Sequence, residues 1–406
     1  MTKHLWDTFA RDNLPSAEQF PEFSNLAELE YPEKLNCANF FLDDAVAEGY
    51  GEQLVIITPL EEYTYERLQK DANQLAHVLV DDCGLIPGNR VLLRAPNSYM
   101  MVVCWFGVVK AGGIAVSTMP LLRAKELGVM IEKAQIKIAL CDTRLKYELI
   151  SAQAETMLDQ ILLFGGSELE KKMSTKPQTF ENCQTNSDDT CLIAFTSGTT
   201  GNPKGTMHYH RDMLTICRAY SEPVLAPKVE DRFIGSPPLA FTFGLGGQLL
   251  FPMYARASTI LLEQATPDLL LAAIKKHQAS IVFTSPTAYR FLLSELKDGD
   301  LSSVRTCVSA GETLPKPTWN SWQEKTGLEI LDGIGSTELL HIFMSSRADD
   351  IRPGSTGKPI SGYEAKVVDD EGNEVAPGTT GKLAVRGPTG CRYLADDRQE
   401  KYVQNG

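Results

Sequence analysis

The hydrophobic pattern of the first half of the chain switches repeatedly between continuous apolar runs and a helical period. Leu54 to Ile57 is a continuous run, which is typical of a buried strand. Thr64 can cap the helix that follows, whose apolar positions recur three or four residues apart: Leu68, Ala72, Leu75, Ala76 and Leu79. This stretch therefore predicts one strand and one helix in succession.

The same succession continues up to residue 140. Turn residues at 87–89 lead into a strand at Val91 to Leu93, and a helix through Trp105 follows it. A glycine pair then precedes a strand at Ile114 to Val116, and Ile136 to Leu140 supplies another. Because strands that alternate with helices pair in the same direction, this pattern favours a parallel sheet covered by helices.

A second α/β region is predicted from residue 189 onward. Helical stretches separate most of its expected strands, which are Cys191 to Phe195, Thr259 to Leu262, Ile281 to Phe283, Val304 to Val308 and Leu328 to Leu331. One helix is well marked, since Thr266 can cap it, Pro267 suits its first turn, and basic residues at 275–277 face the negative end of its dipole.

Segments without this alternation divide the chain. Residues 1–35 are expected to drape over the domain that follows, and the polar run from Leu163 to Asp189 predicts a surface connection. Short β segments at Ala365 to Val368 and Lys382 to Val385 predict a small β region. We therefore expect an α/β fold with an N-terminal extension (1–35), two doubly wound subdomains (36–188 and 189–354) and a small β-barrel subdomain (355–406).

Composition and charge exclude several classes of protein. The formal net charge of -13 argues against a surface for nucleic acid or anionic membranes, because both attract basic patches. The longest apolar stretch, Met100 to Val109, is about half the roughly 20 residues that a membrane span needs. The N-terminal residues lack an apolar signal-peptide core, so a cytoplasmic location is expected. Nine scattered cysteines without a CxxC pair favour reduced thiols over disulfides or zinc.

The candidate chemistry begins with the sequence TSGTTGNPKGT at residues 196–206. Its glycines let successive backbone amides converge on an anion, and Lys204 adds a positive charge. Further hydrogen-bond donors are the hydroxyls on either side of Gly198, the first glycine of the loop: Thr196, Ser197, Thr199 and Thr200. The spacing differs from the GxxxxGK[ST] loop of nucleoside triphosphatases. The segment predicts a different phosphate loop with a helix after it, and a Ser/Thr/Gly-rich surface turn is the alternative.

This loop resembles that of the adenylate-forming superfamily, which includes acyl- and aryl-CoA synthetases, carrier-protein adenylation domains and firefly-type luciferases. A second motif after the strand at Val304 to Val308 resembles the same superfamily and implies adenine contacts at Ala310, Gly311 and Glu312. Both motifs are expected where strands end, which is the usual rim for ligands in open α/β sheets. Without this context, the second motif would be an ordinary strand-to-helix turn.

A third motif resembles the superfamily at Asp332, Gly333, Ile334, Gly335, Ser336, Thr337 and Glu338. Ile334 departs from the aromatic residue more usual there, and it would cover the adenine by apolar contact. The resemblance implies that Thr337 donates to the α-phosphate and that Glu338 holds Mg²⁺, a cation that prefers oxygen ligands. Glu338 as a mere acid at a helix start is the alternative reading.

Residues 333–343 look most like the benzoate- and 2-aminobenzoate-CoA ligase branch of the superfamily. The resemblance implies that a small aromatic carboxylic acid lies between Phe241, Phe243 and glycine backbones, beside Gly335 and Leu340. It also places His341 by the carboxylate or a ring substituent, where an imidazole could donate a hydrogen bond. Core packing remains the alternative for both phenylalanines, and a structural role remains the alternative for the histidine.

The implied reaction forms an acyl adenylate and pyrophosphate from ATP and the acid, with Lys204, the loop amides and Mg²⁺ neutralising charge. Coenzyme A would then take the acyl group and release AMP. Two alternatives stay open: a stand-alone adenylation domain that loads an aryl acid onto a carrier protein, and a non-catalytic module that binds nucleotide and aryl acid. His208 and His210 are expected to start a helix, and no metal is assigned to them.

Superfamily members normally continue through a Gly-Asp motif that holds the ribose hydroxyls, a hinge, and a smaller C-terminal domain with a lysine for adenylation. The 406 residues resemble the large N-terminal domain only. We therefore expect this chain to bind ligands and to adenylate much more slowly than a full-length chain.

Overall fold

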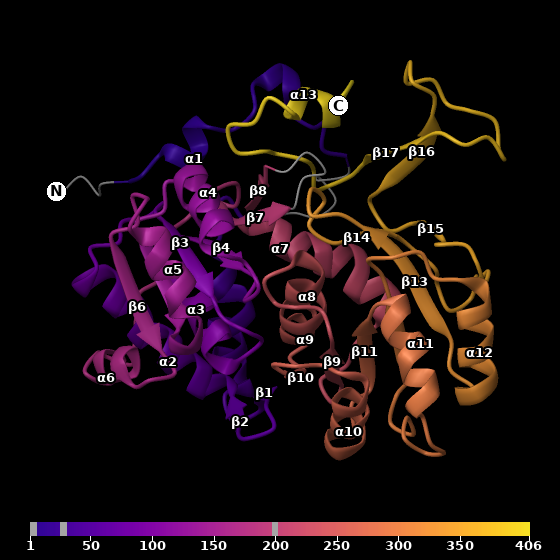
Figure 1. Cartoon of the computed structure of the whole chain (residues 1–406), viewed down its shortest axis with the longest axis horizontal. Coiled ribbons are helices and arrows are strands. Elements are labelled where there is room, and N and C mark those ends of the chain that lie inside the picture. Colours follow the sequence, from indigo (N-terminus) through magenta and orange to yellow (C-terminus); the bar gives the residue numbers. More distant parts are fainter. Residues whose placement is uncertain (1–5, 25–30, 197–201) are drawn as a thin grey trace.

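A computed structural model describes residues 6–24, 31–196 and 202–406, and these ranges form two large sheets and one small one (Figure 1). The first sheet has six strands in the described residues, and β8 alone runs antiparallel to its neighbour. In spatial order they are β6 (Gln160–Phe164), β5 (Ile138–Asp142), β3 (Arg90–Arg94), β4 (Ile114–Thr118), β7 (Thr190–Thr196) and β8 (Lys204–Tyr209).

The second sheet has nine strands in the described residues, with a parallel centre and antiparallel strands at both edges. In spatial order they are β15 (Lys358–Pro359), β14 (Ile342–Ser345), β13 (Ile330–Gly335), β12 (Thr306–Ser309), β11 (Ile281–Thr284), β9 (Arg232–Gly235), β10 (Ser258–Ile260), β1 (Leu54–Ile57) and β2 (Glu62–Thr64). The third sheet is the hairpin of β16 (Glu364–Val368) and β17 (Lys382–Arg386), which projects away from the other two sheets (Figure 1).

Helices form three layers around the two large sheets. The outer face of the first sheet packs against α4 (Ala124–Ala134) and α5 (Lys146–Gln153), and the outer face of the second packs against α10 (Pro267–His277), α11 (Pro286–Glu295) and α12 (Lys316–Thr326). The layer between the sheets contains α2 (Tyr65–His77), α3 (Tyr99–Lys110), α7 (His210–Ile216) and α9 (Phe251–Tyr254). Shorter helices are α1 (Phe9–Asp12), α6 (Glu168–Ser174), α8 (Thr242–Leu245) and α13 (Gln399–Tyr402).

Side chains alternate along each central strand between the middle core and an outer core. On β11, Phe283 lies in the middle core and Val282 in the outer core of the second sheet. On β3, Leu93 faces the middle core and Leu92 the outer core of the first sheet. Both faces of these strands are therefore buried, which explains why they are continuous apolar runs in the sequence.

The two sheets do not follow the predicted division at residue 189. β1 was expected beside the strands that follow it, but it pairs with β10 in the second sheet. β7 was expected in the second α/β region, but it pairs with β4 in the first sheet. A strand buried on both faces fits either sheet equally well by its pattern, so its neighbours are decided only by long-range pairing.

Several local predictions are confirmed and three need correction. Thr64 caps α2 by accepting a hydrogen bond from the Arg67 amide, and α10 begins at Pro267 as expected. The Thr266 hydroxyl, expected to cap α10, makes no capping hydrogen bond and instead donates to the Asp268 carboxylate. The run from Leu163 to Asp189 was expected to lack regular structure, but it contains α6, which is too short to show a clear period. The small β region is present as the antiparallel β16–β17 hairpin, and the described residues do not close it into a barrel.

Among the described residues, no helix is both long enough and apolar enough to cross a membrane. The described part of the N-terminal extension lies against the rest of the chain. The Asp7 carboxylate pairs with Arg90 at 2.5 Å, and Phe23 pairs with Gly387 in a parallel bridge.

Two helical glycines predict opposite effects of adding a methyl group. A Cβ atom at Gly107 in α3 would lie 2.8 Å from the Leu75 side chain of α2, whereas one at Gly128 in α4 would have ordinary contact with Thr156 at 3.6 Å. We expect Gly107→Ala to lower the free energy of unfolding by about 1–3 kcal/mol through overpacking. We expect Gly128→Ala to leave it unchanged or raise it by up to about 1 kcal/mol. Urea denaturation of both variants measures this, and equal effects would contradict the close packing of α2 on α3.

Candidate functional site

The described ends of the phosphate loop are joined by strand pairing. Thr196 at the end of β7 pairs with Lys204 at the start of β8, so the loop closes an antiparallel hairpin. The expected helix, α7, begins only at His210 after β8. Ser197, Gly198, Thr199 and Thr200 lie outside the described residues. The Thr196 hydroxyl is buried without a hydrogen-bond partner among the described residues, which leaves it available to a ligand.

The lysine of the loop is buried against the third motif. Lys204 is 6% exposed, and its Nζ lies 3.2 Å from Oε1 of Glu338. The same Nζ donates to the hydroxyl of Tyr393 at 2.5 Å, and that hydroxyl donates to Glu338 Oε1 at 2.5 Å. Two predicted residues that are 134 positions apart therefore meet, and Tyr393 joins them.

The Glu338 carboxylate is stabilised in its charged form. Burial alone would raise the pKa of Glu338, but hydrogen bonds from Tyr393 and a backbone amide, together with the charge of Lys204, lower it below its ordinary value. The group is therefore ionised at neutral pH. Thr337 precedes it and is half-buried.

The two predicted adenine motifs lie side by side. β12 and β13 pair in parallel so that Ser309 faces Asp332, and both motifs continue from the C-terminal ends of these strands. Ala310 is buried, Gly311 and Glu312 are exposed, and Gly311 has a φ of +90°, a value that favours glycine. Gly333 is buried, whereas Ile334 is 38% exposed at the same edge.

Asp332 is a buried acid with an incompletely satisfied carboxylate. Its Oδ1 has no hydrogen-bond partner among the described residues. Burial raises the pKa of Asp332 to about 6, although hydrogen bonds from Ser309, the Gly333 amide and Thr356 oppose the shift. A carboxylate of this kind can accept a hydrogen bond from a polar ligand that reaches it.

Two of the predicted acyl residues, Phe243 and Gly335, lie next to His341, which is 2% exposed. The His341 ring lies 4.6 Å from the Phe251 ring and 5.6 Å from the Phe243 ring, measured between centroids. A Cβ atom at Gly335 would lie 2.6 Å from the His341 carbonyl oxygen, so a side chain there would collide with the backbone. Phe241 is half-exposed, and Leu340 is fully buried in the middle core.

His341 is a neutral hydrogen-bond acceptor in this setting. Burial lowers the pKa of His341 to about 3, against a smaller opposing effect of the Phe243 carbonyl. Its Nε2 lies 3.3 Å from that carbonyl oxygen, and because a carbonyl can only accept, Nε2 carries the hydrogen. Nδ1 is then a bare acceptor, and it has no partner among the described residues.

His208 and His210 occupy different elements. His208 lies on β8, not in the expected helix, and His210 begins α7. The side chains of His210, Cys37 and Cys191 are buried with their potential ligand atoms within 4.8 Å of one another. The Nδ1 of His210 accepts a hydrogen bond from the Cys37 amide at 3.1 Å, so core hydrogen bonding accounts for the position of this histidine.

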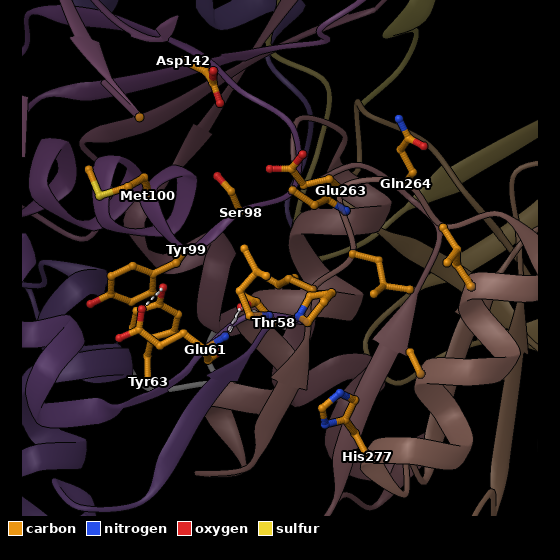
Figure 2. Close-up of a pocket in the computed structure, with 18 of the residues that line it drawn as sticks. Thr58, Glu61, Tyr63, Ser98, Tyr99, Met100, Asp142, Glu263, Gln264 and His277 are labelled. Atoms are coloured by element: carbon orange, nitrogen blue, oxygen red, sulfur yellow. Dashed lines mark hydrogen bonds between the residues drawn. The ribbon is translucent and has the colours of Figure 1, made fainter. Parts of the chain in front are cut away.

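A cavity of about 660 Å³ lies between residues of the two large sheets (Figure 2). Its walls include Asp142 at the end of β5 and Glu263 after β10, which both pair with Arg144. Tyr63 and Tyr99 stack beside it with ring centroids 3.6 Å apart. None of the predicted ATP or acyl residues lines this cavity.

Two aromatic residues of the site were not predicted from the sequence. Tyr393 bonds to Lys204 and Glu338, and the ring of Tyr402 lies over the Lys204 ammonium with its centroid 3.8 Å from Nζ. Both lie after the last predicted β segment, Lys382 to Val385, where no spacing or composition marks them. Only the pairing of this segment with β8 brings them to the lysine.

Comparison with known proteins identifies similar sequences and folds. A family model described as AMP-binding enzyme matches residues 43–393. Benzoate–CoA ligase of Thauera aromatica is 32% identical over 374 residues, which cover 89% of this chain and 70% of that protein.

Two solved structures have the same fold. The anthranilate CoA ligase AuaEII in complex with anthranoyl-AMP has a TM-score of 0.87 and 34% identity, covering 91% of this chain and 74% of that one. ATP-bound MatB from Rhodopseudomonas palustris has a TM-score of 0.81 and 28% identity, covering 90% of this chain and 73% of that one.

The buried Asp332 predicts a specific pH dependence of stability. Its pKa is raised from 3.8 to about 6, so its contribution to stability is fully present below about pH 4 and is lost as the pH rises through 6. We expect the unfolding free energy of the unaltered protein to fall relative to that of Asp332→Asn by about 1–3 kcal/mol between pH 4 and pH 7. Denaturant titrations at both pH values measure the difference, and parallel curves would refute the assignment.

Proposed function

The chain belongs to the AMP-binding enzyme family, and on this basis we propose that it activates an aromatic carboxylic acid with ATP and transfers the acyl group to coenzyme A. The family membership expected from the three motifs is thereby confirmed. The observation that carries the proposal is the meeting of Lys204 and Glu338 at the closed end of the β7–β8 hairpin, beside the ends of β12 and β13. This arrangement places a cation that can bind phosphates, Lys204, next to an anion that can bind a metal ion, Glu338.

The proposed first step needs no protein base. A carboxylate oxygen of the acid, already ionised at neutral pH, attacks the α-phosphorus of ATP, and the bond to the leaving pyrophosphate breaks. Lys204 and the Thr196 hydroxyl would neutralise charge on the phosphates, and Thr337 would donate to the α-phosphate. In the second step, the sulfur of coenzyme A attacks the acyl carbon, the bond to AMP breaks, and the thiol proton goes to solvent.

Glu338 suits the role of a magnesium ligand. Its Oε1 accepts hydrogen bonds from Lys204 and Tyr393. An ionised carboxylate fits the preference of Mg²⁺ for oxygen ligands. A bound Mg²⁺ would supply positive charge to the phosphates. Glu338 would then bind Mg²⁺ in place of part of its contact with Lys204. The Lys204 ammonium would thereby become free to bind phosphate oxygens.

The setting of His341 supports an aromatic acid with a hydrogen-bond donor on its ring. The cluster around His341 is formed by aromatic rings and glycine backbones, which suits a flat ligand. The bare Nδ1 can accept a hydrogen bond, as from a 2-amino group, but it cannot donate one to a carboxylate. We therefore place 2-aminobenzoate ahead of unsubstituted benzoate as the substrate.

Ligand binding tests the proposed function directly. We expect benzoate or 2-aminobenzoate together with Mg-ATP to raise the thermal unfolding midpoint more than either ligand alone, because both bind only the folded state. In Lys204→Met, which keeps the length of the side chain without its charge, the increment from ATP should shrink. Thermal shift assays with hexanoate as the control acid measure this. Stabilisation by hexanoate and not by aryl acids would refute the proposed substrate class.

The acceptor role of His341 predicts a change in preference between two acids. Removing the acceptor in His341→Leu should weaken binding of 2-aminobenzoate about fivefold, equivalent to one hydrogen bond of about 1 kcal/mol. Binding of benzoate, which has no amino group, should change by less than about twofold. Calorimetric titration of both acids in the presence of Mg-ATP measures the ratio. An equal loss for both acids would show that His341 serves only to pack the core.

A further inference from the structure

The C-terminal segment from Cys391 to Tyr402 extends the first sheet at the edge next to the phosphate loop. The Met207 amide donates to the Arg392 carbonyl, and the Leu394 amide donates to the Gly205 carbonyl, each at 2.8 Å. Thr206 and Tyr393 form an antiparallel bridge between these bonds. The segment therefore runs along β8 and carries its aromatic side chains to the loop lysine.

Tyr393 and Tyr402 surround the ammonium of Lys204 in different ways. The Tyr393 hydroxyl has one hydrogen, which it donates to Glu338, so it accepts from Lys204. Burial raises the pKa of Tyr393, and the nearby Cys391 and Glu338 raise it further, so the hydroxyl keeps that hydrogen. Tyr402 offers the face of its ring, 3.8 Å from Nζ, and packs edge to face on Tyr393 with centroids 5.6 Å apart.

The helix that carries Tyr402 is anchored by bonds that do not involve the lysine. Gln399 begins α13 and is 2% exposed. Its Nε2 donates to the Gln19 and Cys391 carbonyls at 2.9 Å, and its Oε1 accepts from the Tyr393 amide at 2.9 Å. Figure 1 shows α13 above the edge of the first sheet, close to β8. The Gln399 side chain thus anchors the start of α13, which carries Tyr402, while the Tyr402 side chain itself is 48% exposed.

The geometry points to Tyr402 as a positioning residue for the loop lysine, and we propose that its ring holds the Lys204 ammonium at the phosphate site. This inference rests on the proposed function, in which Lys204 serves the phosphates that leave as pyrophosphate. A cation over a ring face keeps its other sides free for anions. When ATP arrives, the ammonium can exchange Glu338 for a phosphate oxygen without leaving the ring. Tyr402 touches neither substrate in this arrangement and acts through Lys204 alone.

Two variants separate the ring from the hydroxyl. Tyr402→Phe retains the ring face over Nζ and removes only the hydroxyl, so this variant is the matched control. Tyr402→Leu removes the ring and retains an apolar side chain. We expect Tyr402→Leu to bind Mg-ATP about three to ten times more weakly, and Tyr402→Phe to bind within about twofold of the unaltered protein.

AMP distinguishes positioning from general damage. It lacks the two phosphates assigned to Lys204, so both variants should bind AMP as the unaltered protein does. Calorimetric titration of this chain with Mg-ATP and with AMP measures both affinities. The proposal is overturned if Tyr402→Leu binds Mg-ATP normally, if it loses AMP and ATP affinity equally, or if Tyr402→Phe is as weak as Tyr402→Leu.

Failure of the proposed function gives a different result. Suppose that aryl acids do not bind, while Tyr402→Leu weakens the affinity for Mg-ATP relative to that for AMP as expected. The proposed substrate is then wrong and the role of Tyr402 stands. If the unaltered protein binds no ATP, both proposals fall.

Discussion

A buried ammonium is costly unless charged and polar groups replace its water, and this constraint organises the candidate site. Lys204 meets it with the Glu338 carboxylate, the Tyr393 hydroxyl and the face of Tyr402. These partners come from β13 onward and from the C-terminal segment, far along the chain from the loop. The contacts of this one cation therefore connect Lys204 on β8 of the first sheet with Glu338, which follows β13 of the second sheet.

The two sheets can hold this site because they share a core. α2, α3, α7 and α9 lie between them, and apolar residues of both sheets face this layer. The chain also crosses between the sheets, since β1 joins the second sheet and β7 the first. A relative movement of the sheets would disrupt the shared core as well as the ion pair. Lys204, the ends of β12 and β13, and His341 are thus held in a fixed arrangement.

Within that arrangement, burial sets the chemistry of individual groups. It lowers the pKa of His341 to about 3 and raises that of Asp332 to about 6, so one is a neutral acceptor and the other a weakly stabilised carboxylate. Glu338 is also buried, but its donors more than offset burial and its pKa is lowered. The pKa values of these three side chains are therefore shifted differently, because burial acts on all of them and their hydrogen-bond and charged partners differ.

The sequence alone determined the α/β class, most strand positions, the cap of α2, the start of α10 and the three motifs, because these depend on local pattern and spacing. It also placed Lys204 and Glu338 in one site through their resemblance to a family. It could not assign β1 and β7 to sheets, because strands buried on both faces carry no pattern that selects a neighbour. Nor could it find α6, the strand before α7, the orientation of His341, or Tyr393 and Tyr402. Tertiary structure decided these, because each depends on contacts between segments distant in the sequence.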